Sequence, residues 1–310
     1  MESKRIDDHK VRVLILANPK AGSGYGREQL AEFATLAENA GYPTEIISHP
    51  EEFSAKIHRA FELGELRAAV AAGGDGTAEY VATLCPPTTP ILLFPLGTEN
   101  LLAKYLGLTN NPSDALRILQ DGQIVCMDAA KANDKIFLIM LGCGFDAEVV
   151  RRVHRARQGH ISHWAYAKPI LGAMRSYRYP PIRVRCLTAD QSKPEVTIEA
   201  HWAFVFNVPS YAGGLGICPD ADPFDGQLDV VTFEGGSIWH GLYHLSSIML
   251  GRHRLSNEVR TIRCHQVELF STTNEVNYQV DGDPGGTLPV SVQALPGHVH
   301  LFVPADYLPS

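Results

Sequence analysis

One short segment, Gly73–Thr77, constrains the fold of this chain more than any other part of its sequence. It reads GGDGT and directly follows the apolar run Ala68–Ala72. A buried strand that ends in a glycine-rich turn lets backbone N–H groups approach a phosphate closely, because glycine accepts φ > 0 and carries no Cβ. The helical pattern of Ala78–Leu84 would direct its positive end at the same phosphate. The segment predicts a nucleotide-binding turn, and the alternative is a tight turn without a ligand.

Two further turns of similar composition follow strand-like runs. Asn18–Gly24 comes after Val11–Ala17, and Pro95–Asn100 comes after Ile91–Phe94. In an open α/β sheet the carboxyl ends of the strands line the ligand crevice. Three such turns, all rich in Gly, Asn and Thr, favour a binding site over a plain turn.

Length and composition exclude several classes of protein. The chain has 310 residues, which is enough for two domains, and its net charge of −7 argues against electrostatic binding to nucleic acid. No apolar stretch reaches the roughly 18–20 residues of a membrane span, and the N-terminus lacks the apolar core of a signal peptide. The six cysteines are scattered without a CxxC pair. We therefore expect a cytoplasmic protein with core thiols rather than a disulfide framework.

The pattern of predicted strands and helices changes near residue 130. Before that point strands alternate with helical patterns, which predicts a parallel sheet covered on both faces. Helices are expected at Arg27–Asn39, Ser54–Leu63, Leu101–Leu106 and Ser113–Leu119, the last with Ser113 as its N-cap. After that point strands dominate. They are expected at Lys135–Leu141, Ile182–Leu187, Glu195–Asn207, Leu228–Phe233, Glu258–Phe270, Asn277–Val280 and Val290–Ala294, with helices near 146–156, 164–177 and 238–250.

Seven motifs, taken in order along the chain, resemble the diacylglycerol-kinase catalytic superfamily, specifically its soluble bacterial lipid kinases, which are also similar to sphingosine kinases. They are Asn18–Pro19, Gly73–Thr77, Pro95–Asn100, Gly144–Glu148, Asn207–Gly214, Asp222–Asp229 and Asp281–Pro284. The resemblance implies an α/β nucleotide-binding domain over 1–130, of the NAD kinase and diacylglycerol kinase type, and a β-sandwich domain over 131–310. The extreme C-terminus is a candidate to return to the first domain, and the active site is expected in the interdomain cleft.

The resemblance implies an ATP-dependent kinase that transfers the γ-phosphate to a lipid hydroxyl with Mg²⁺ as cofactor. The expected ATP-binding residues are Asn18, Ser48, Gly73, Gly74, Asp75, Gly76, Thr77, Ala78, Thr98 and Asn100. Asp75 is the candidate for a metal-linked or hydroxyl-orienting carboxylate. Asp283 is the candidate general base, at a position where the family usually has glutamate. The shorter side chain could move that carboxylate by about 1 Å, a displacement that can matter for rate. Since Asp-Gly favours type I′ turns, a plain hairpin is the alternative.

The acidic loop Asp222–Asp229 is a separate candidate site. Carboxylate and carbonyl oxygens suit Mg²⁺ or Ca²⁺, and relatives hold a structural Mg²⁺ here. Position matching gives Asp222, Asp225 and the backbone carbonyl of Gln227 as metal ligands. The alternative is a solvated acidic turn.

Two further features bear on the substrate. Leu101 stands where diacylglycerol kinases usually have Asp, which weakens the case for diacylglycerol and leaves lysophospholipid, ceramide and sphingoid-base acceptors open. The basic run Arg151–Lys168 carries aromatic residues and could dock transiently on an anionic membrane, although a solvated helix face is equally consistent with it. The rival functions are an NAD kinase-like enzyme and a catalytically weakened lipid- or nucleotide-binding protein. The sequence leaves the oligomeric state open.

Overall fold

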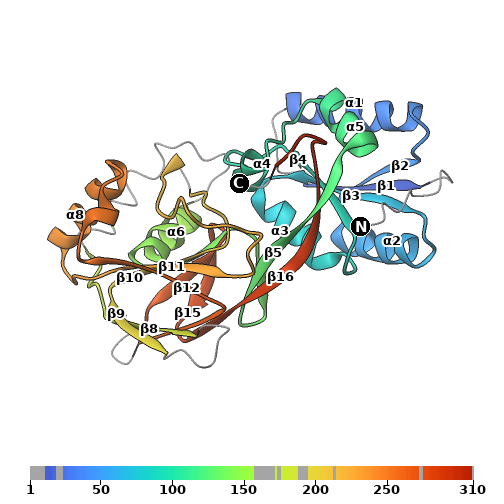
Figure 1. Cartoon of the computed structure of the whole chain (residues 1–310). Helices are drawn as coiled ribbons and strands as arrows, with labels where there is room; N and C mark the ends of the chain where they lie inside the picture. Colours follow the sequence, from blue (N-terminus) through green and yellow to red (C-terminus); the bar gives the residue numbers. More distant parts are fainter. Residues whose placement is uncertain are drawn as a thin grey trace. The chain divides into compact units, whose positions relative to one another are not determined.

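The computed structural model describes residues 11–18, 24–156, 172, 176–187, 195–211, 214–271 and 275–308. The chain forms two compact units, one made of residues 1–127 and 298–310 and the other of residues 128–297. The boundary falls inside two strands, after Met127 in β5 (Gln123–Ala132) and after Gly297 in β16 (Val290–Val303) (Figure 1).

The first unit is built on a parallel sheet with the strand order β2-β1-β3-β4, and the second half of β16 lies beside β4. The strands are β1 (Arg12–Ala17), β2 (Thr44–Ile47), β3 (Leu66–Gly73) and β4 (Pro90–Pro95). Short runs such as Ala68–Ala72 are buried throughout. Such runs are what a sheet covered on both faces requires, so the predicted α/β domain with a parallel sheet is confirmed.

Helices cover both faces of this sheet. They are α1 (Gly24–Asn39), α2 (Pro50–Glu62), α3 (Asp75–Leu84), α4 (Leu101–Tyr105) and α5 (Pro112–Asp121). Figure 1 shows α1 and α5 on one face and α2 on the other. The predicted N-cap of α5 is wrong: Asn111, not Ser113, caps this helix. The Oδ1 atom of Asn111 accepts from the backbone N–H of Ser113 at 2.9 Å and of Asp114 at 3.1 Å, and proline occupies the first helical position.

The second unit is a β-sandwich, as predicted. One antiparallel sheet has the order β12-β11-β10-β7-β14-β15, and the other contains the first half of β16 followed by β13, β8 and β9. The strands are β6 (Lys135–Phe137), β7 (Met140–Gly144), β8 (Ile182–Leu187), β9 (Val196–Ala200), β10 (Trp202–Phe206), β11 (Leu228–Phe233), β12 (Val259–Cys264), β13 (Gln266–Phe270), β14 (Asn277–Val280) and β15 (Asp283–Thr287). Inward-facing residues of both sheets, such as Val205 and Val267, form one apolar core.

Three predicted strands each divide into two strands that lie in different sheets. Glu195–Asn207 divides at His201 into β9 and β10, and Glu258–Phe270 divides at His265 into β12 and β13; the two halves lie in different sheets each time. Lys135–Leu141 likewise divides into β6 and β7. The sequence pattern hides a corner because the chain continues to bury one side of each strand after it changes sheet. Strands β5 and β15 were not predicted, and β16 extends nine residues past its predicted end at Ala294.

The remaining elements of the second unit are α6 (Phe145–Ala156), α8 (Ile238–Met249) and the short η3 (His253–Leu255). The first two confirm predicted helices, and the third predicted helix, at 164–177, falls largely outside the described residues. The cysteines are free thiols, and the buried ones are Cys143, Cys186, Cys218 and Cys264. Within the described ranges, no helix is long and apolar enough to cross a membrane.

Candidate active site

The predicted nucleotide-binding residues of the first unit follow the carboxyl ends of its neighbouring parallel strands. Ser48 follows β2 and Asn18 follows β1, and both are exposed. The backbone N–H of Asn18 donates to the carbonyl of Ala72 at 3.2 Å, and that of Leu96 donates to the carbonyl of Gly73 at 2.8 Å. The structure therefore gathers four strand ends at one edge of the sheet, as a ligand crevice requires.

Two glycines of these turns, Gly73 and Gly97, are required by close packing. A Cβ atom on Gly73 would lie 2.2 Å from the Oγ1 atom of Thr77, and one on Gly97 would lie 2.6 Å from the Cα atom of Gly74. None of these glycines adopts a positive φ, and Gly74 has a φ of −94°. These glycines therefore do not use the positive φ that glycine permits. Gly73 is needed because a Cβ atom would collide with Thr77 of the same turn, and Gly97 is needed because the GGDGT turn and the Pro95–Asn100 turn are in van der Waals contact.

Asp75 joins these two turns. Its Oδ2 atom accepts from the backbone N–H of Leu101 at 3.0 Å, and its Oδ1 atom accepts from that of Leu102 at 3.1 Å. These are unpaired donors of the first turn of α4, which has no side-chain cap of its own. Burial raises the pKa of Asp75, and the two backbone hydrogen bonds oppose that rise. Each oxygen keeps a second lone pair, so the capping role leaves a metal or hydroxyl contact feasible.

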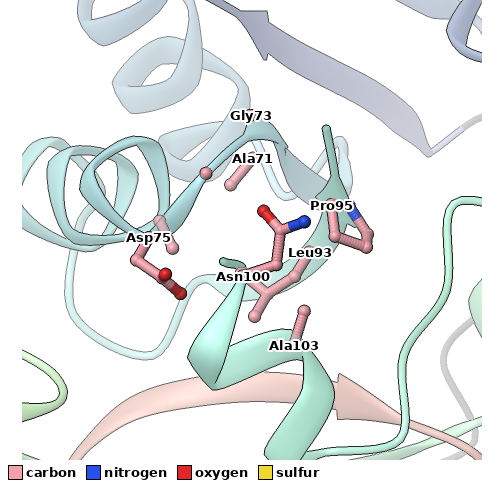
Figure 2. Close-up of a pocket in the computed structure, with 9 residues that line it drawn as sticks. Ala71, Gly73, Asp75, Leu93, Pro95, Asn100 and Ala103 are labelled. Carbon is pink, nitrogen blue, oxygen red and sulfur yellow. The ribbon is translucent and has the colours of Figure 1, made fainter. Parts of the chain in front are cut away.

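Asn100 closes the second turn. Its Oδ1 atom accepts from the backbone N–H of Gly97 at 2.9 Å, and its Nδ2 atom donates to the carbonyl of the same residue at 2.9 Å. Its φ of 50° lies in the left-handed region, which asparagine tolerates better than most residues. Figure 2 shows the Asp75 and Asn100 side chains at a small pocket. The lining residues are Ala71, Gly73, Gly74, Asp75, Ala78, Leu93, Pro95, Asn100 and Ala103.

In the second unit, the candidate base lies beside a tight hairpin turn. Asp281 and Gly282 connect β14 to β15 with φ values of 49° and 88°, as a type I′ turn requires. Asp283 is the first residue of β15, and 47% of its side chain is exposed. Its Oδ1 atom lies 3.9 Å from the Nδ1 atom of His154, the one ion pair that the described residues give it.

Asp281 has a different environment from Asp283. Its carboxylate accepts hydrogen bonds from three consecutive backbone N–H groups, those of Leu138 at 2.8 Å, Ile139 at 3.0 Å and Met140 at 2.8 Å. These contacts fasten the turn to the segment that leads into β7. Asp281 therefore has a structural role, whereas the Asp283 carboxylate is accessible to solvent.

A buried network missed by sequence reasoning supports the same turn. The backbone N–H of Gly282 donates to the Oε1 atom of Gln279 at 2.8 Å, and the Nε2 atom of Gln279 donates to the Oδ2 atom of Asp146 at 2.9 Å. The hydroxyl of Tyr211 donates to the other oxygen of Asp146. Burial raises the pKa of Asp146, and these two hydrogen bonds oppose that rise. The motif containing Asp146 was visible in the sequence, but its partners lie far away along the chain.

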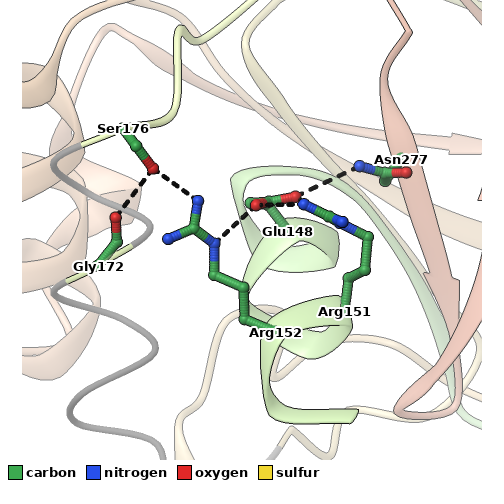
Figure 3. Close-up of polar contacts among 6 residues, drawn as sticks. All are labelled: Glu148, Arg151, Arg152, Gly172, Ser176 and Asn277. Carbon is green, nitrogen blue, oxygen red and sulfur yellow. Dashed lines mark hydrogen bonds and ion pairs between the residues drawn. The ribbon is translucent and has the colours of Figure 1, made fainter. Parts of the chain in front are cut away.

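Two arginines of the basic run Arg151–Lys168 bind a buried carboxylate (Figure 3). The Nε atom of Arg151 donates to Oε2 of Glu148 at 2.8 Å, and the Nε atom of Arg152 donates to Oε1 at 2.6 Å. Arg152 also donates to the hydroxyl of Ser176 at 2.6 Å. These two arginine side chains are therefore paired with a buried carboxylate of the same unit. Residues 157–168 lie outside the described residues, so a membrane role for the run stays a prediction.

The acidic loop is held by hydrogen bonds of its own. The Oδ1 atom of Asp222 accepts from the backbone N–H of Phe224 at 3.0 Å, and that of Asp225 accepts from Gln227 at 2.9 Å. Asp128, which sequence reasoning missed, accepts from the N–H of Gly226 at 2.6 Å. The pKa of Asp128 is raised by burial and also by the negative charges of Asp225 and Asp222. This concentration of negative charge suits a cation.

Arg263 already supplies part of the compensating charge. Its guanidinium lies 3.2 Å from the carboxylate of Asp229 and 3.6 Å from that of Asp225. Among the described residues, no three His, Cys, Asp or Glu side chains are grouped as a metal centre would need. The proposed ligands, two carboxylates and the carbonyl of Gln227, fit an ion that keeps several of its waters.

Two sequence families match nearly the whole chain. Residues 12–132 match the diacylglycerol kinase catalytic domain. Residues 140–303 match the YegS C-terminal NAD kinase beta sandwich-like domain. This chain belongs to the diacylglycerol kinase superfamily. It is a lipid kinase, a phosphotransferase that uses ATP as its phosphoryl donor, and the resemblance seen in the sequence is confirmed.

Relatives within the diacylglycerol kinase superfamily match over nearly their full length. A diacylglycerol kinase of Mycobacterium tuberculosis is 28% identical, over 98% of this chain and 99% of the relative. One from Staphylococcus aureus is 24% identical, over 95% and 93%. The crystal structure of a diacylglycerol kinase from Bacillus anthracis has a TM-score of 0.67 at 17% identity, and covers 97% of this chain and 100% of the other. A second structure from that organism has a TM-score of 0.73 at 20% identity, with the same coverage.

Kinases of the diacylglycerol kinase superfamily typically require a divalent metal ion, and the acidic loop offers a test for a structural one. Adding Mg²⁺ after exhaustive chelation should raise the melting temperature of the protein, because a bound ion stabilises the state that binds it. The Asp225→Ala variant should lose this response, as well as activity. Calorimetry with and without Mg²⁺ gives the melting temperatures of the wild type and of the variant. A metal-independent melting temperature in the wild type would mean that Asp128 and Arg263 hold the loop without an ion.

Proposed function

We propose that this lipid kinase transfers the γ-phosphate of ATP to a hydroxyl of a membrane lipid, namely diacylglycerol, a sphingoid base or a related lipid. The observation that carries the proposal is the joining of two glycine-rich strand ends by Asp75. That arrangement places the first turn of α3, where backbone N–H groups and the helix dipole favour an anion, at the carboxyl edge of a parallel sheet. The relatives named diacylglycerol kinase support a lipid acceptor, while Leu101 argues for testing acceptors other than diacylglycerol.

We assign the two units different roles in the reaction. The first unit would bind ATP, with the phosphates held by Gly73–Ala78 and further contacts from Asn18, Ser48, Thr98 and Asn100. The second unit would provide the lipid-binding surface and the general base Asp283. We propose Mg²⁺ as the metal for transfer, and Mg²⁺ or Ca²⁺ for the structural site at Asp222, Asp225 and Gln227.

The residues would divide the chemistry as follows. Phosphoryl transfer needs an aligned nucleophile and support for the charge that spreads over the phosphoryl oxygens. Backbone N–H groups at the start of α3 would hold the phosphates, and a bound divalent ion would neutralise charge on them. Asp283 would accept the proton of the lipid hydroxyl as its oxygen attacks phosphorus. The Asp283 carboxylate is exposed and lies 3.9 Å from His154, so it is accessible to accept that proton.

The deciding experiment uses the full chain, radiolabelled ATP and a mixed lipid extract, with the labelled product identified by its mass. We expect a Mg²⁺-dependent phosphorylated lipid. NAD is assayed in parallel, because an NAD kinase would share the GGDGT turn. Phosphorylation of NAD without any lipid product would overturn the proposal. Tight ATP binding without turnover over the lipid panel would instead favour a protein that has lost its activity.

Two glycine variants separate phosphate contact from turn structure. Gly74 has an ordinary φ, and a Cβ atom there would lie 3.4 Å from the Cα atom of Gly97, a normal contact. Gly74→Ala should therefore keep the melting temperature and weaken ATP binding by at least about tenfold, because the added carbon blocks close approach of a phosphate. Gly97→Ala should lower both, because its Cβ atom would collide with the backbone of Gly74. Unchanged ATP affinity in Gly74→Ala would show that the turn does not contact phosphate.

A further inference from the structure

Helix α8 carries its large apolar side chains on the face that points away from the protein. The exposed apolar residues are Ile238, Trp239, Leu242, Tyr243, Met249 and Leu250. Trp239 is 76% exposed, and Met249 and Leu250 are each 69% exposed. The buried residues of the helix are Gly241, His244, Ser247 and Ile248. An ordinary surface helix buries its large apolar residues and exposes its small and polar ones, so the arrangement of side chains on α8 is the reverse of the usual one.

The exposed residues form one continuous stripe, which we name the apolar face of α8. At 3.6 residues per turn they fall within an arc of about 140°. Ser246 shares that arc, and the whole segment Ile238–Leu250 contains no Asp, Glu, Lys or Arg. Leu255, which is 83% exposed, follows in η3. Apolar surface gathered in this way marks an interaction site more often than isolated exposed residues do.

The inner side of the helix is fixed in place, so the apolar face cannot simply roll inward. The hydroxyl of Ser237 caps the helix by accepting from the backbone N–H of His240 at 3.3 Å. The Nε2 atom of His244 lies 2.6 Å from the carbonyl oxygen of Glu234. Gly241 packs so closely on Tyr179 that a Cβ atom would lie 2.4 Å from the Tyr179 hydroxyl. The outward orientation is therefore built into the packing.

Positive charge lies at the carboxyl end of the apolar face. Arg252 is exposed, and the described part of the chain records no ion pair for it. Arg254 is also exposed and pairs with Asp220. Arginines at the end of an apolar helix that bears Trp and Tyr match the layers of an anionic membrane surface, where aromatic rings sit at the headgroups and cations meet lipid phosphates.

We propose that the apolar face of α8 docks on the surface of an anionic phospholipid bilayer. The proposal rests on the proposed function, because a kinase whose acceptor is a membrane lipid must work at the bilayer surface. Leu242, Met249 and Leu250 would enter the boundary between headgroups and acyl chains, Trp239 and Tyr243 would lie at the headgroups, and Arg252 would contact lipid phosphate. The residues of this face are different from those of the basic run Arg151–Lys168.

Binding is tested with the full chain and sedimented vesicles of phosphatidylcholine, with and without phosphatidylglycerol. The double variant Trp239→Ser, Leu242→Ser should bind about 10- to 100-fold more weakly, since two apolar side chains no longer leave water. Arg252→Glu should remove most of the preference for phosphatidylglycerol. The matched control is Leu63→Ser, which removes an exposed leucine, 59% exposed, at the end of α2. It should bind as the wild type does.

A second measurement separates this proposal from the proposed function. Each protein is assayed on a short-chain, water-soluble lipid acceptor and on the same lipid class in vesicles. The double variant should keep its rate on the soluble acceptor and lose it on vesicles. No phosphorylation of either acceptor by the wild type would contradict the proposed function, while vesicle binding would still decide the role of α8. Equal vesicle binding by the wild type and the double variant would overturn the docking proposal. So would a wild-type dimer that ignores vesicles and that the double variant converts to a monomer.

Discussion

Replacing Asp283 by asparagine should lower kcat by about 10²- to 10⁴-fold, with little change in ATP affinity. A lipid hydroxyl is weakly acidic, so its proton must leave as the bond to phosphorus forms, and an amide cannot accept that proton. The side chain of Asp283 is exposed and carries no backbone hydrogen bond in the described structure, so the fold should not depend on its charge. Steady-state kinetics together with an ATP-binding titration measure the two effects separately.

The neighbouring residue provides the control for this prediction. Asp281→Asn should mainly lower the melting temperature, because the Asp281 carboxylate accepts from three backbone N–H groups and an amide has only one acceptor oxygen. Asp283→Glu restores the family's usual residue and should keep substantial activity. If Asp283→Asn keeps full kcat while Asp281→Asn loses it at unchanged stability, the base is Asp281.

The Asp75→Asn variant should lose nearly all activity and also some stability. The loss of activity follows from removing a charge beside the proposed phosphate turn, where electrostatic support of transfer commonly contributes factors of about 10² or more. Stability should fall because the Asp75 carboxylate accepts hydrogen bonds from two backbone N–H groups of α4, one on each oxygen. The amide of asparagine has only one acceptor oxygen, so one of these hydrogen bonds would be lost. Loss of a helix cap costs about 0.5–2 kcal/mol. Chemical denaturation and kinase assays measure the two losses.

A matched control distinguishes a cap from a functional carboxylate. Asn111→Ala removes the N-cap of α5, whose Oδ1 atom also accepts from two backbone N–H groups. It should cost a similar amount of stability and leave activity nearly unchanged. If Asp75→Asn loses no more activity than Asn111→Ala does, Asp75 serves only to hold the two turns together.

The fold was predictable where short-range patterns decide the structure. A short apolar run that ends in a glycine-rich turn, such as Ala68–Ala72, is typical of a strand buried on both faces, and the helical patterns that alternate with such runs indicate a parallel sheet. The corners at His201 and His265 were not predictable in the same way. Their residues continue the alternation of the strands on either side, so only the pairing with other strands reveals that the chain changes sheet.

In the candidate site, too, local sequence patterns predicted some features and missed those that depend on distant residues. The GGDGT string indicates a tight turn between a strand and a helix, and the Asp-Gly pair at Asp281 indicates a type I′ turn that the structure contains. The support of these turns could not be predicted, because it depends on contacts between distant parts of the chain. Asp146 and Gln279 are 133 residues apart in the sequence, and Asp75 caps a helix that begins 26 residues later. No local pattern encodes such partners.

The division of β16 between the two units has a consequence for biosynthesis. Residues from His298 onward belong to the first unit, where His300 and Leu301 pair with Pro90 and Ile91 of β4. A ribosome would therefore complete the whole second unit before it releases the strand that covers the edge of β4. Until then, the nascent first unit presents an unpaired strand edge, a ready template for aggregation. Chains truncated after residue 297 should therefore be bound by chaperones or degraded, although they contain every residue proposed here to bind ATP.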